Sequence, residues 1–138
     1  MTAAHAYESG QHAVVSDLMS RPVLTVEVGE TLWDAWQLLF VSGLRHLVVL
    51  DEDGTSLGVL SDRNILAEVP ATAEHLSGRR VGDVLAMVPL VSVHPADSPL
   101  TAARVMTSNA VEALPVLDSD GRLVGVVTES DIVHWLVR

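Results

Sequence analysis

Two short stretches of the chain carry the side chains best suited to chemistry, and they recur 67 residues apart. In the later stretch an apolar run ends at Thr128, and Asp131 follows three positions on. The earlier stretch has Ser61 and Asn64 in the same places. A hydroxyl residue followed at this spacing by a carboxylate or amide is typical of a strand that ends at the N-terminus of a helix.

Such a corner is a natural place for an anion or a sugar hydroxyl. The N-terminus of a helix leaves backbone N–H groups without intrahelical partners and carries the positive end of the helix dipole. The Asp131 carboxylate can accept hydrogen bonds from two hydroxyls at once. The same side chains can instead cap the helix by accepting from its backbone N–H groups. The residues alone therefore leave two interpretations open, a ligand site and a structural cap.

Composition and charge argue against several classes of function. The 138-residue chain has a formal net charge of −10, which argues against binding to nucleic-acid phosphates. Its apolar runs, such as residues 88–93, are far shorter than the ~20 residues of a membrane-spanning helix. Cysteine is absent, and the histidines lack the spacing of metal ligands, so we expect no disulfide and no metal site. A cytoplasmic location without membrane attachment is expected.

The elements that position the first corner follow from hydrophobic periodicity. A helix is expected to begin after Thr31 and to end at Gly43. Its predicted core stripe is Leu32, Ala35, Trp36, Leu39 and Phe40. Trp33 and Val41 lie outside that stripe, which implies a second contact surface on this helix, either within the fold or with another subunit. Residues 46–60 are then predicted to form an antiparallel hairpin, and Ser61 begins the next helix.

The same order of elements recurs in the second half, with a strand predicted at residues 91–93 to correspond to one at residues 24–26, which indicates an internal duplication. We predict a flexible N-terminal arm at residues 1–13, repeat one at 14–70, a connector at 71–80 and repeat two at 81–138. The predicted fold class is α/β (α+β), with tandem β-α-β-β-α repeats. Neither repeat, at roughly 60 residues, should bury much core alone, so the sheets are expected to pack together about a pseudo-twofold axis.

Three sets of residues make the chain resemble the cystathionine-β-synthase (CBS) domain pair, or Bateman module. They are the lead-in Ser16-Asp17-Leu18-Met19 with Arg21-Pro22-Val23, the passage Gly43-Leu44-Arg45-His46-Leu47-Val48-Val49-Leu50-Asp51, and the two corners. The resemblance covers about residues 14–137, so we expect a stand-alone protein. It implies a regulatory module without catalysis that binds an adenine nucleotide and is often a dimer of pairs.

The resemblance also implies roles for individual residues in the cleft between the repeats. Asp131 would hold the ribose hydroxyls, with Thr128 beside the ribose or phosphate. Pro22 and Leu24, from the lead-in strand of the other repeat, would line the adenine pocket. The phosphates would meet basic side chains of repeat one, namely Arg45, His46 and Arg63.

The corner at Ser61 and Asn64 would form the pseudo-symmetric second site. Repeat two supplies Glu112, Ala113 and Ser130 at the positions of Arg45, His46 and Arg63. A polyphosphate would meet repulsion from Glu112, so we expect this second site to be empty or to take an uncharged nucleoside-like ligand.

The resulting functional hypothesis is a cytoplasmic, homodimeric energy sensor. It would bind AMP, ADP or ATP, with S-adenosylmethionine as a further candidate, and signal occupancy to an unknown protein partner. No cofactor, enzymatic activity or nucleic-acid partner is expected. The alternative is a ligand-independent dimerisation or protein-interaction module in which the corner residues act only as helix caps.

Overall fold

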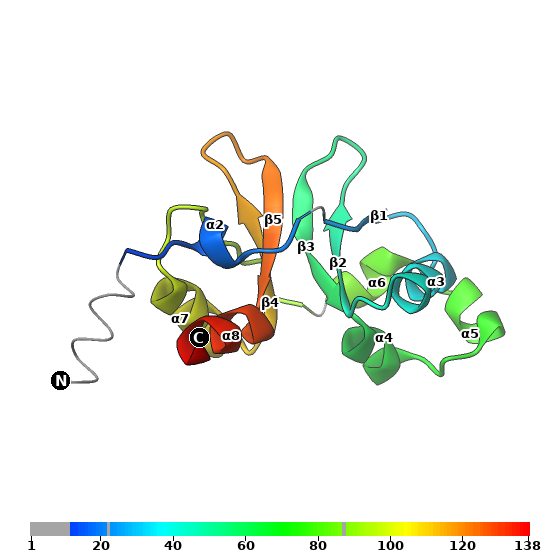
Figure 1. Ribbon diagram of the computed structural model, residues 1–138. Coiled ribbons are helices and arrows are strands. Elements are labelled where there is room, and N and C mark those ends of the chain that lie inside the picture. The colour runs from blue at the N-terminus through cyan, green and yellow to red at the C-terminus, as the bar shows by residue number, and fades with distance from the viewer. Residues whose placement is uncertain (1–11, 22, 87) are drawn as a thin grey trace. The chain divides into compact units, whose positions relative to one another are not determined.

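The computed structural model describes residues 12–21, 23–86 and 88–138, which form two compact units (Figure 1). One unit joins the chain up to Arg21 with Val91–Arg138, and the other is Pro22–Leu90. We call them the C-terminal unit and the N-terminal unit. The predicted arm at 1–13 falls almost entirely outside the described residues. The sequence-based repeat boundaries and the packing of the two sheets stay predictions.

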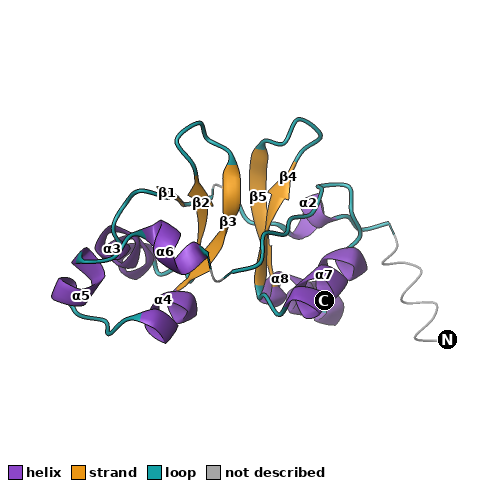
Figure 2. Ribbon diagram, turned by 180° about the vertical axis from the view of Figure 1, so that it is seen from behind, coloured by secondary structure: helices purple, strands orange, loops and turns teal. Residues whose placement is uncertain are grey.

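The N-terminal unit is a three-stranded sheet with helices on one side of it (Figure 2). Its elements are β1 (Thr25–Glu27), α3 (Leu32–Ser42), β2 (His46–Leu50), β3 (Ser56–Ser61), α4 (Asp62–Glu68), α5 (Ala73–Ser77) and α6 (Val81–Leu85). Strand β2 is central, parallel to β1 and antiparallel to β3. This confirms the predicted hairpin and the mixed fold class, while the predicted connector at 71–80 contains the short helix α5.

Helix α3 has the predicted ends. The Thr31 hydroxyl accepts a hydrogen bond from the Asp34 N–H at 3.1 Å, and Gly43 ends the helix with a left-handed φ of 72°. Leu39 is buried in the core as expected, but the prediction for Phe40 is wrong, because its side chain is 82% exposed. With 3.6 residues per turn, Phe40 lies about a quarter turn beyond Leu39, outside the buried side of the helix.

The C-terminal unit has a two-stranded antiparallel sheet. Its elements are α2 (Val15–Leu18), α7 (Pro99–Asn109), β4 (Ala113–Leu117), β5 (Leu123–Thr128) and α8 (Glu129–Val137). Among the described residues of either unit, no helix has the length and apolarity needed to cross a membrane.

The strand predicted at residues 91–93 is reduced to a single bridge between Val93 and Val116. In the N-terminal unit the equivalent ladder includes bonds from the N–H groups of Val48 and Val28. Prolines, Pro115 and Pro95, occupy the two corresponding places in the C-terminal unit. Proline has no N–H to donate, so the ladder cannot extend on either side of Val93, and this part of the prediction is wrong.

The N-terminal lead-in, which contains α2, packs against the second repeat rather than the first. Helix α2 therefore lies beside β5 (Figure 1). Ser20 and Val126 exchange two backbone hydrogen bonds of 2.8 and 3.2 Å. Gly125 makes this approach possible, since a Cβ there would stand 2.5 Å from the Met19 sulfur and 3.1 Å from the Ser20 carbonyl oxygen. The close contact explains why β5 carries a glycine next to its central valines.

We therefore expect Gly125→Ala to lower the free energy of unfolding by about 1–3 kcal/mol, the usual cost of overpacking. Gly29→Ala is the control, because a Cβ at position 29 would have no neighbouring atom within 4 Å and the φ of Gly29 is not left-handed. It should change stability by less than about 0.5 kcal/mol. Urea denaturation of both variants measures the difference, and equal midpoints would contradict the steric role of Gly125.

Candidate functional site

The corner of the C-terminal unit joins β5 to α8 through two reciprocal hydrogen bonds. The Asp131 Oδ2 atom accepts from the Thr128 N–H at 2.8 Å, and the Thr128 hydroxyl accepts from the Asp131 N–H at 3.3 Å. Both residues are half-buried. Within the described part of the chain, Oδ2 is the only Asp131 oxygen that accepts a hydrogen bond, so Oδ1 is available as an acceptor.

The corner of the N-terminal unit joins β3 to α4 in a similar way. The Asn64 Oδ1 atom accepts from the Ser61 N–H at 2.8 Å and from the Ser61 hydroxyl at 2.9 Å. In return, the Ser61 hydroxyl accepts from the Asn64 N–H at 3.1 Å. The Asn64 oxygen is thus engaged twice, and the side-chain NH₂ group is the part of the amide left to meet a ligand.

The two corners therefore differ in chemistry although their backbones match. The Asp131 corner offers a charged acceptor, which suits hydroxyl groups. The Asn64 corner offers a donor, which suits carbonyl or other acceptor groups. The same hydrogen bonds fully account for both corners as capping boxes. The geometry is thus compatible with both interpretations of the sequence.

Arg45 and His46 lie beside the Ser61 corner of their own unit. His46 is paired with Ser61 across β2 and β3, and the Arg45 carbonyl accepts from the Asp62 N–H at 3.3 Å. The Arg45 Nε atom also lies 3.6 Å from Asp62 Oδ2, with side chains 57% and 33% exposed. This exposed ion pair contributes little to stability, and it keeps the guanidinium close to the corner.

Acidic residues replace this ion pair in the C-terminal unit. Glu112 precedes β4 where Arg45 precedes β2, and the Glu112 carbonyl accepts from the Glu129 N–H at 2.9 Å. Glu129 therefore stands where Asp62 stands in the other unit. One corner has a cation beside its acid, whereas the other has two acids at the equivalent places.

The predicted site residues thus fall into two groups. Thr128 and Asp131 meet in the C-terminal unit, and Arg45, His46, Arg63, Ser61 and Asn64 meet in the N-terminal unit. Leu24 also belongs to the N-terminal unit, where its carbonyl accepts from the Val48 N–H at 3.0 Å. Pro22 lies outside the described residues. The sharing of one ligand between the two groups stays a prediction.

Sequence reasoning did not assign a role to Asp62, the partner of Arg45. The sequence does indicate this position, because an acidic residue directly follows the hydroxyl residue of each corner. These residues are Asp62 after Ser61 and Glu129 after Thr128. A second acidic group lies in the hairpin turn between β2 and β3. Hydrogen bonding with the Asp51 side chain, together with donation from the Thr55 hydroxyl and N–H, lowers the pKa of Asp53. No cluster of three or more metal-ligating side chains occurs among the described residues.

Comparison with known proteins gives a consistent family match. The family model described as CBS domain matches residues 15–71 and 81–138. A CBS domain-containing protein of Dictyostelium discoideum is 31% identical over 134 residues, covering 91% of this chain and 92% of the relative. The homoserine O-acetyltransferase of Methanococcoides burtonii is 31% identical over 88% of this chain, which spans only 24% of that enzyme.

Solved structures agree with the family match. The crystal structure of CBSX2 in complex with AMP has a TM-score of 0.72 and 29% sequence identity to this chain. The alignment covers 90% of this chain and 96% of CBSX2. The fold described above is therefore shared with a protein that has been solved with a bound nucleotide.

The capping function of Asp131 can be measured apart from any ligand. Asp131→Ala removes the acceptor for the Thr128 N–H and should lower the free energy of unfolding by about 1 kcal/mol. Asp131→Asn keeps an acceptor oxygen, as Asn64 does in the other corner, and should cost less than Asp131→Ala. Urea denaturation without nucleotide compares the variants. Equal losses for both would mean that charge, rather than the cap, stabilises this helix end.

Proposed function

This chain belongs to the CBS domain family, and from that premise we propose that it is a non-catalytic regulatory module that binds an adenine nucleotide. CBS domain pairs are regulatory modules, and CBSX2 has been solved with AMP. The observation that carries the proposal is the Asp131 carboxylate, which has one oxygen in the helix cap and the other available. Thr128, the N-cap residue of α8, lies beside it.

The chemistry of this corner fits a ribose. The two neighbouring hydroxyls of a ribose are donors, and a partly buried carboxylate is a strong acceptor for them. The cap holds the Asp131 side chain in one position, so little conformational entropy is lost when a ligand binds. Direct phosphate contact with Asp131 is disfavoured by like charge, which assigns the sugar rather than the phosphates to this residue.

The phosphates of the same ligand require cations from elsewhere in the chain. We assign them to Arg45, His46 and Arg63, which the N-terminal unit gathers at the start of β2 and on the first turn of α4. An arginine presents a planar fork of donors that matches phosphate oxygens. The ion pair with Asp62 holds Arg45 near this place. Leu24 and Pro22 are proposed to meet the adenine.

As a regulatory module, the chain would act through another protein. We propose that it works as a cytoplasmic homodimer that senses cellular energy through AMP, ADP or ATP and passes occupancy on to a protein partner. S-adenosylmethionine, which contains an adenosine group, is a second candidate ligand for the same corner.

One observation favours the alternative function, a ligand-independent interaction module. Helix α3 exposes large apolar side chains, with Phe40 82% and Val41 84% exposed. Apolar surface of this kind is typical of protein contacts. In this alternative, the corners are caps and the helix face carries the function.

The nucleotide proposal is tested by isothermal titration calorimetry with AMP, ADP and ATP. The wild-type chain should bind at least one of them, and Asp131→Asn should bind it at least ~10-fold more weakly, because an acceptor for the ribose is lost. A thermal shift panel that includes S-adenosylmethionine identifies the preferred ligand, since a ligand of the native state raises the melting temperature. No heat from any nucleotide on folded protein would favour the interaction module.

The phosphate assignment is tested by Arg45→Gln. This variant should weaken ATP binding by about 10-fold, as expected when a charged hydrogen bond is lost, and should weaken AMP binding less. Arg104→Gln on the exposed surface of α7 is the control and should leave both affinities unchanged. If Arg45→Gln and Arg104→Gln bind both nucleotides like the wild type, Arg45 does not contact the phosphates.

A further inference from the structure

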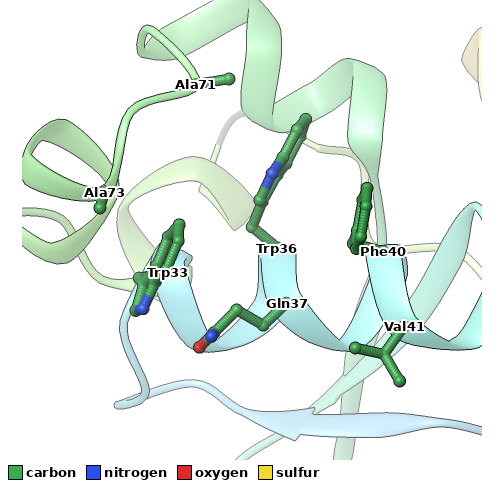
Figure 3. Close-up of a pocket in the computed structure, with 7 residues that line it drawn as sticks. All are labelled: Trp33, Trp36, Gln37, Phe40, Val41, Ala71 and Ala73. Carbon is green, nitrogen blue, oxygen red and sulfur yellow. The ribbon is translucent and has the colours of Figure 1, made fainter.

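Helix α3 carries an apolar groove that the nucleotide proposal does not use. The groove has a volume of about 420 Å³ and lies between α3 and the chain segment that leads into α5. Figure 3 shows Trp33, Trp36 and Phe40 in a row along α3, on the side that faces Ala71 and Ala73. None of the lining residues that the structure describes is charged.

The apolar outward face of α3 is not needed for the fold. Helices α3 and α7 occupy the same place in the two repeats and are both 11 residues long. Their buried positions match, with Leu32, Ala35 and Leu39 in α3 and Pro99, Ala102 and Met106 in α7. Their outward positions do not match, because Gln37, Phe40 and Val41 correspond to Arg104, Thr107 and Ser108. Since the α7 version folds with polar residues there, packing within the repeat does not explain the apolar residues of α3.

Acidic residues border the groove on both of its sides. On α3, Asp34 lies between the two tryptophans of the lining. On the opposite side, Glu68 ends α4 three residues before Ala71, and Glu74 follows Ala73 on α5. All three acidic residues are exposed. A molecule that enters the groove therefore meets an apolar centre and negative charge at its edges.

The chain segments that form the groove contain no cation to offset this charge. Residues 30–44 and 64–78, all of which the structure describes, include no lysine and no arginine. The arginines that adjoin these segments lie at the Ser61 corner or beside Asp83; they are Arg45, Arg63 and Arg79. The whole chain has a formal net charge of −10, so its long-range field has the same sign as the border of the groove.

We propose that this groove docks a basic amphipathic helix of a protein partner. The inference rests on the proposed function, in which the module acts through another protein, and it names the surface and the chemistry of that contact. The apolar side of the helix fills the groove, and lysine or arginine residues along its edges meet Asp34, Glu68 and Glu74. Complementary charge of this kind speeds the encounter and excludes acidic partners.

The aromatic row matches the way a helix fills a groove. Trp33, Trp36 and Phe40 span seven residues, or about 10 Å along α3, which is two turns of a helix. An incoming helix with apolar residues at i, i+3, i+4 and i+7 presents its anchors over the same length. Phe40 and Val41, which are 82% and 84% exposed, have much surface left to bury. The Gln37 amide can donate to and accept from a polar group of the partner, which fixes the register.

The contact is expected to be weak and reversible. Two turns of helix bury less than about 1,200 Å², which is the range of transient signalling contacts. The exposed carboxylates contribute more to the association rate than to the final affinity. Salt screens them, with a Debye length of about 8 Å at physiological ionic strength. Binding should therefore weaken as the salt concentration rises.

A labelled peptide tests the docking directly by fluorescence anisotropy. The probe is a leucine–lysine peptide of about 18 residues, long enough to be helical, with leucine at positions i, i+3, i+4 and i+7. One control peptide has the same composition in an order without an apolar face, and another has glutamate in place of lysine. The probe should bind at least ~10-fold more tightly than either control. Equal binding of all three peptides would overturn the proposal.

Substitutions in the chain show whether the groove is the binding site. Phe40→Thr with Val41→Ser gives α3 the residues of α7 and should weaken probe binding at least ~10-fold. Val133→Thr with Val137→Ser is the matched control on α8, where these valines are 55% and 75% exposed, and should leave binding unchanged. A probe that binds both double variants like the wild type does not occupy the groove.

A second pair of variants tests the charged border. Asp34→Asn with Glu74→Gln removes two of its charges and should weaken binding about 3-fold at low salt and less at high salt. Glu52→Gln with Asp120→Asn removes the same charge from the two hairpin turns and should change binding less. If these double variants bind the probe alike, the net charge of the chain attracts the peptide and the border has no specific role, contrary to the proposal.

Tryptophan fluorescence locates the bound peptide. The chain has three tryptophans, and after Trp135→Phe the two that remain line the groove. Docking of the tryptophan-free probe should shift their emission to shorter wavelength, and saturation without a shift would contradict docking in the groove. A wild type that self-associates in sedimentation and does not bind the probe would also overturn the proposal, because a second copy would then cover the groove.

Nucleotide titration of the same protein separates this inference from the function on which it rests. If the chain binds AMP, ADP or ATP but not the probe, the docking site is rejected and the nucleotide function stands. If it binds the probe at the groove but none of the nucleotides, the docking site is supported and the nucleotide function is rejected.

Discussion

The strand-to-helix corner depends on two reciprocal hydrogen bonds between the N-cap residue and the third residue of the helix. In both units these bonds fix the direction in which the helix leaves the sheet, and with it the place of every side chain on the first turn. They also engage one polar atom of Asp131 or Asn64 and leave another available. A single acid-to-amide difference between the repeats therefore changes what a corner can bind without changing how it folds.

The two repeats share a pattern but differ where proline is involved. Pro95 and Pro115 lack the N–H groups that would extend the ladder at Val93. The predicted strand is therefore reduced to the two backbone hydrogen bonds that Val93 forms with β4. On the other strand of this sheet, Ser20 forms two backbone hydrogen bonds with Val126 of β5. The glycine at position 125 is what allows that segment to approach the strand.

Local features of the fold could be predicted because local chemistry determines them. The caps at Thr31 and Ser61, the left-handed Gly43 and the hairpin of β2 and β3 depend on residues close in sequence. The exposure of Phe40 could not be predicted, since apolar residues on two sides of a helix do not show which side faces the core. The Asp62 partner of Arg45 was missed for a related reason: the pairing links a strand start to a helix turn 17 residues later.

The comparison of α3 with α7 bears on how a duplicated fold acquires new contacts. Both helices keep small or aliphatic residues at the positions that meet the sheet, because those positions are constrained by packing. The outward positions carry no such constraint, so they can become apolar in one repeat and remain polar in the other. The corners follow the same logic, with the hydrogen bonds of the cap retained and the charges around them exchanged. In these elements the buried positions therefore preserve the repeat, whereas the exposed positions distinguish its two copies.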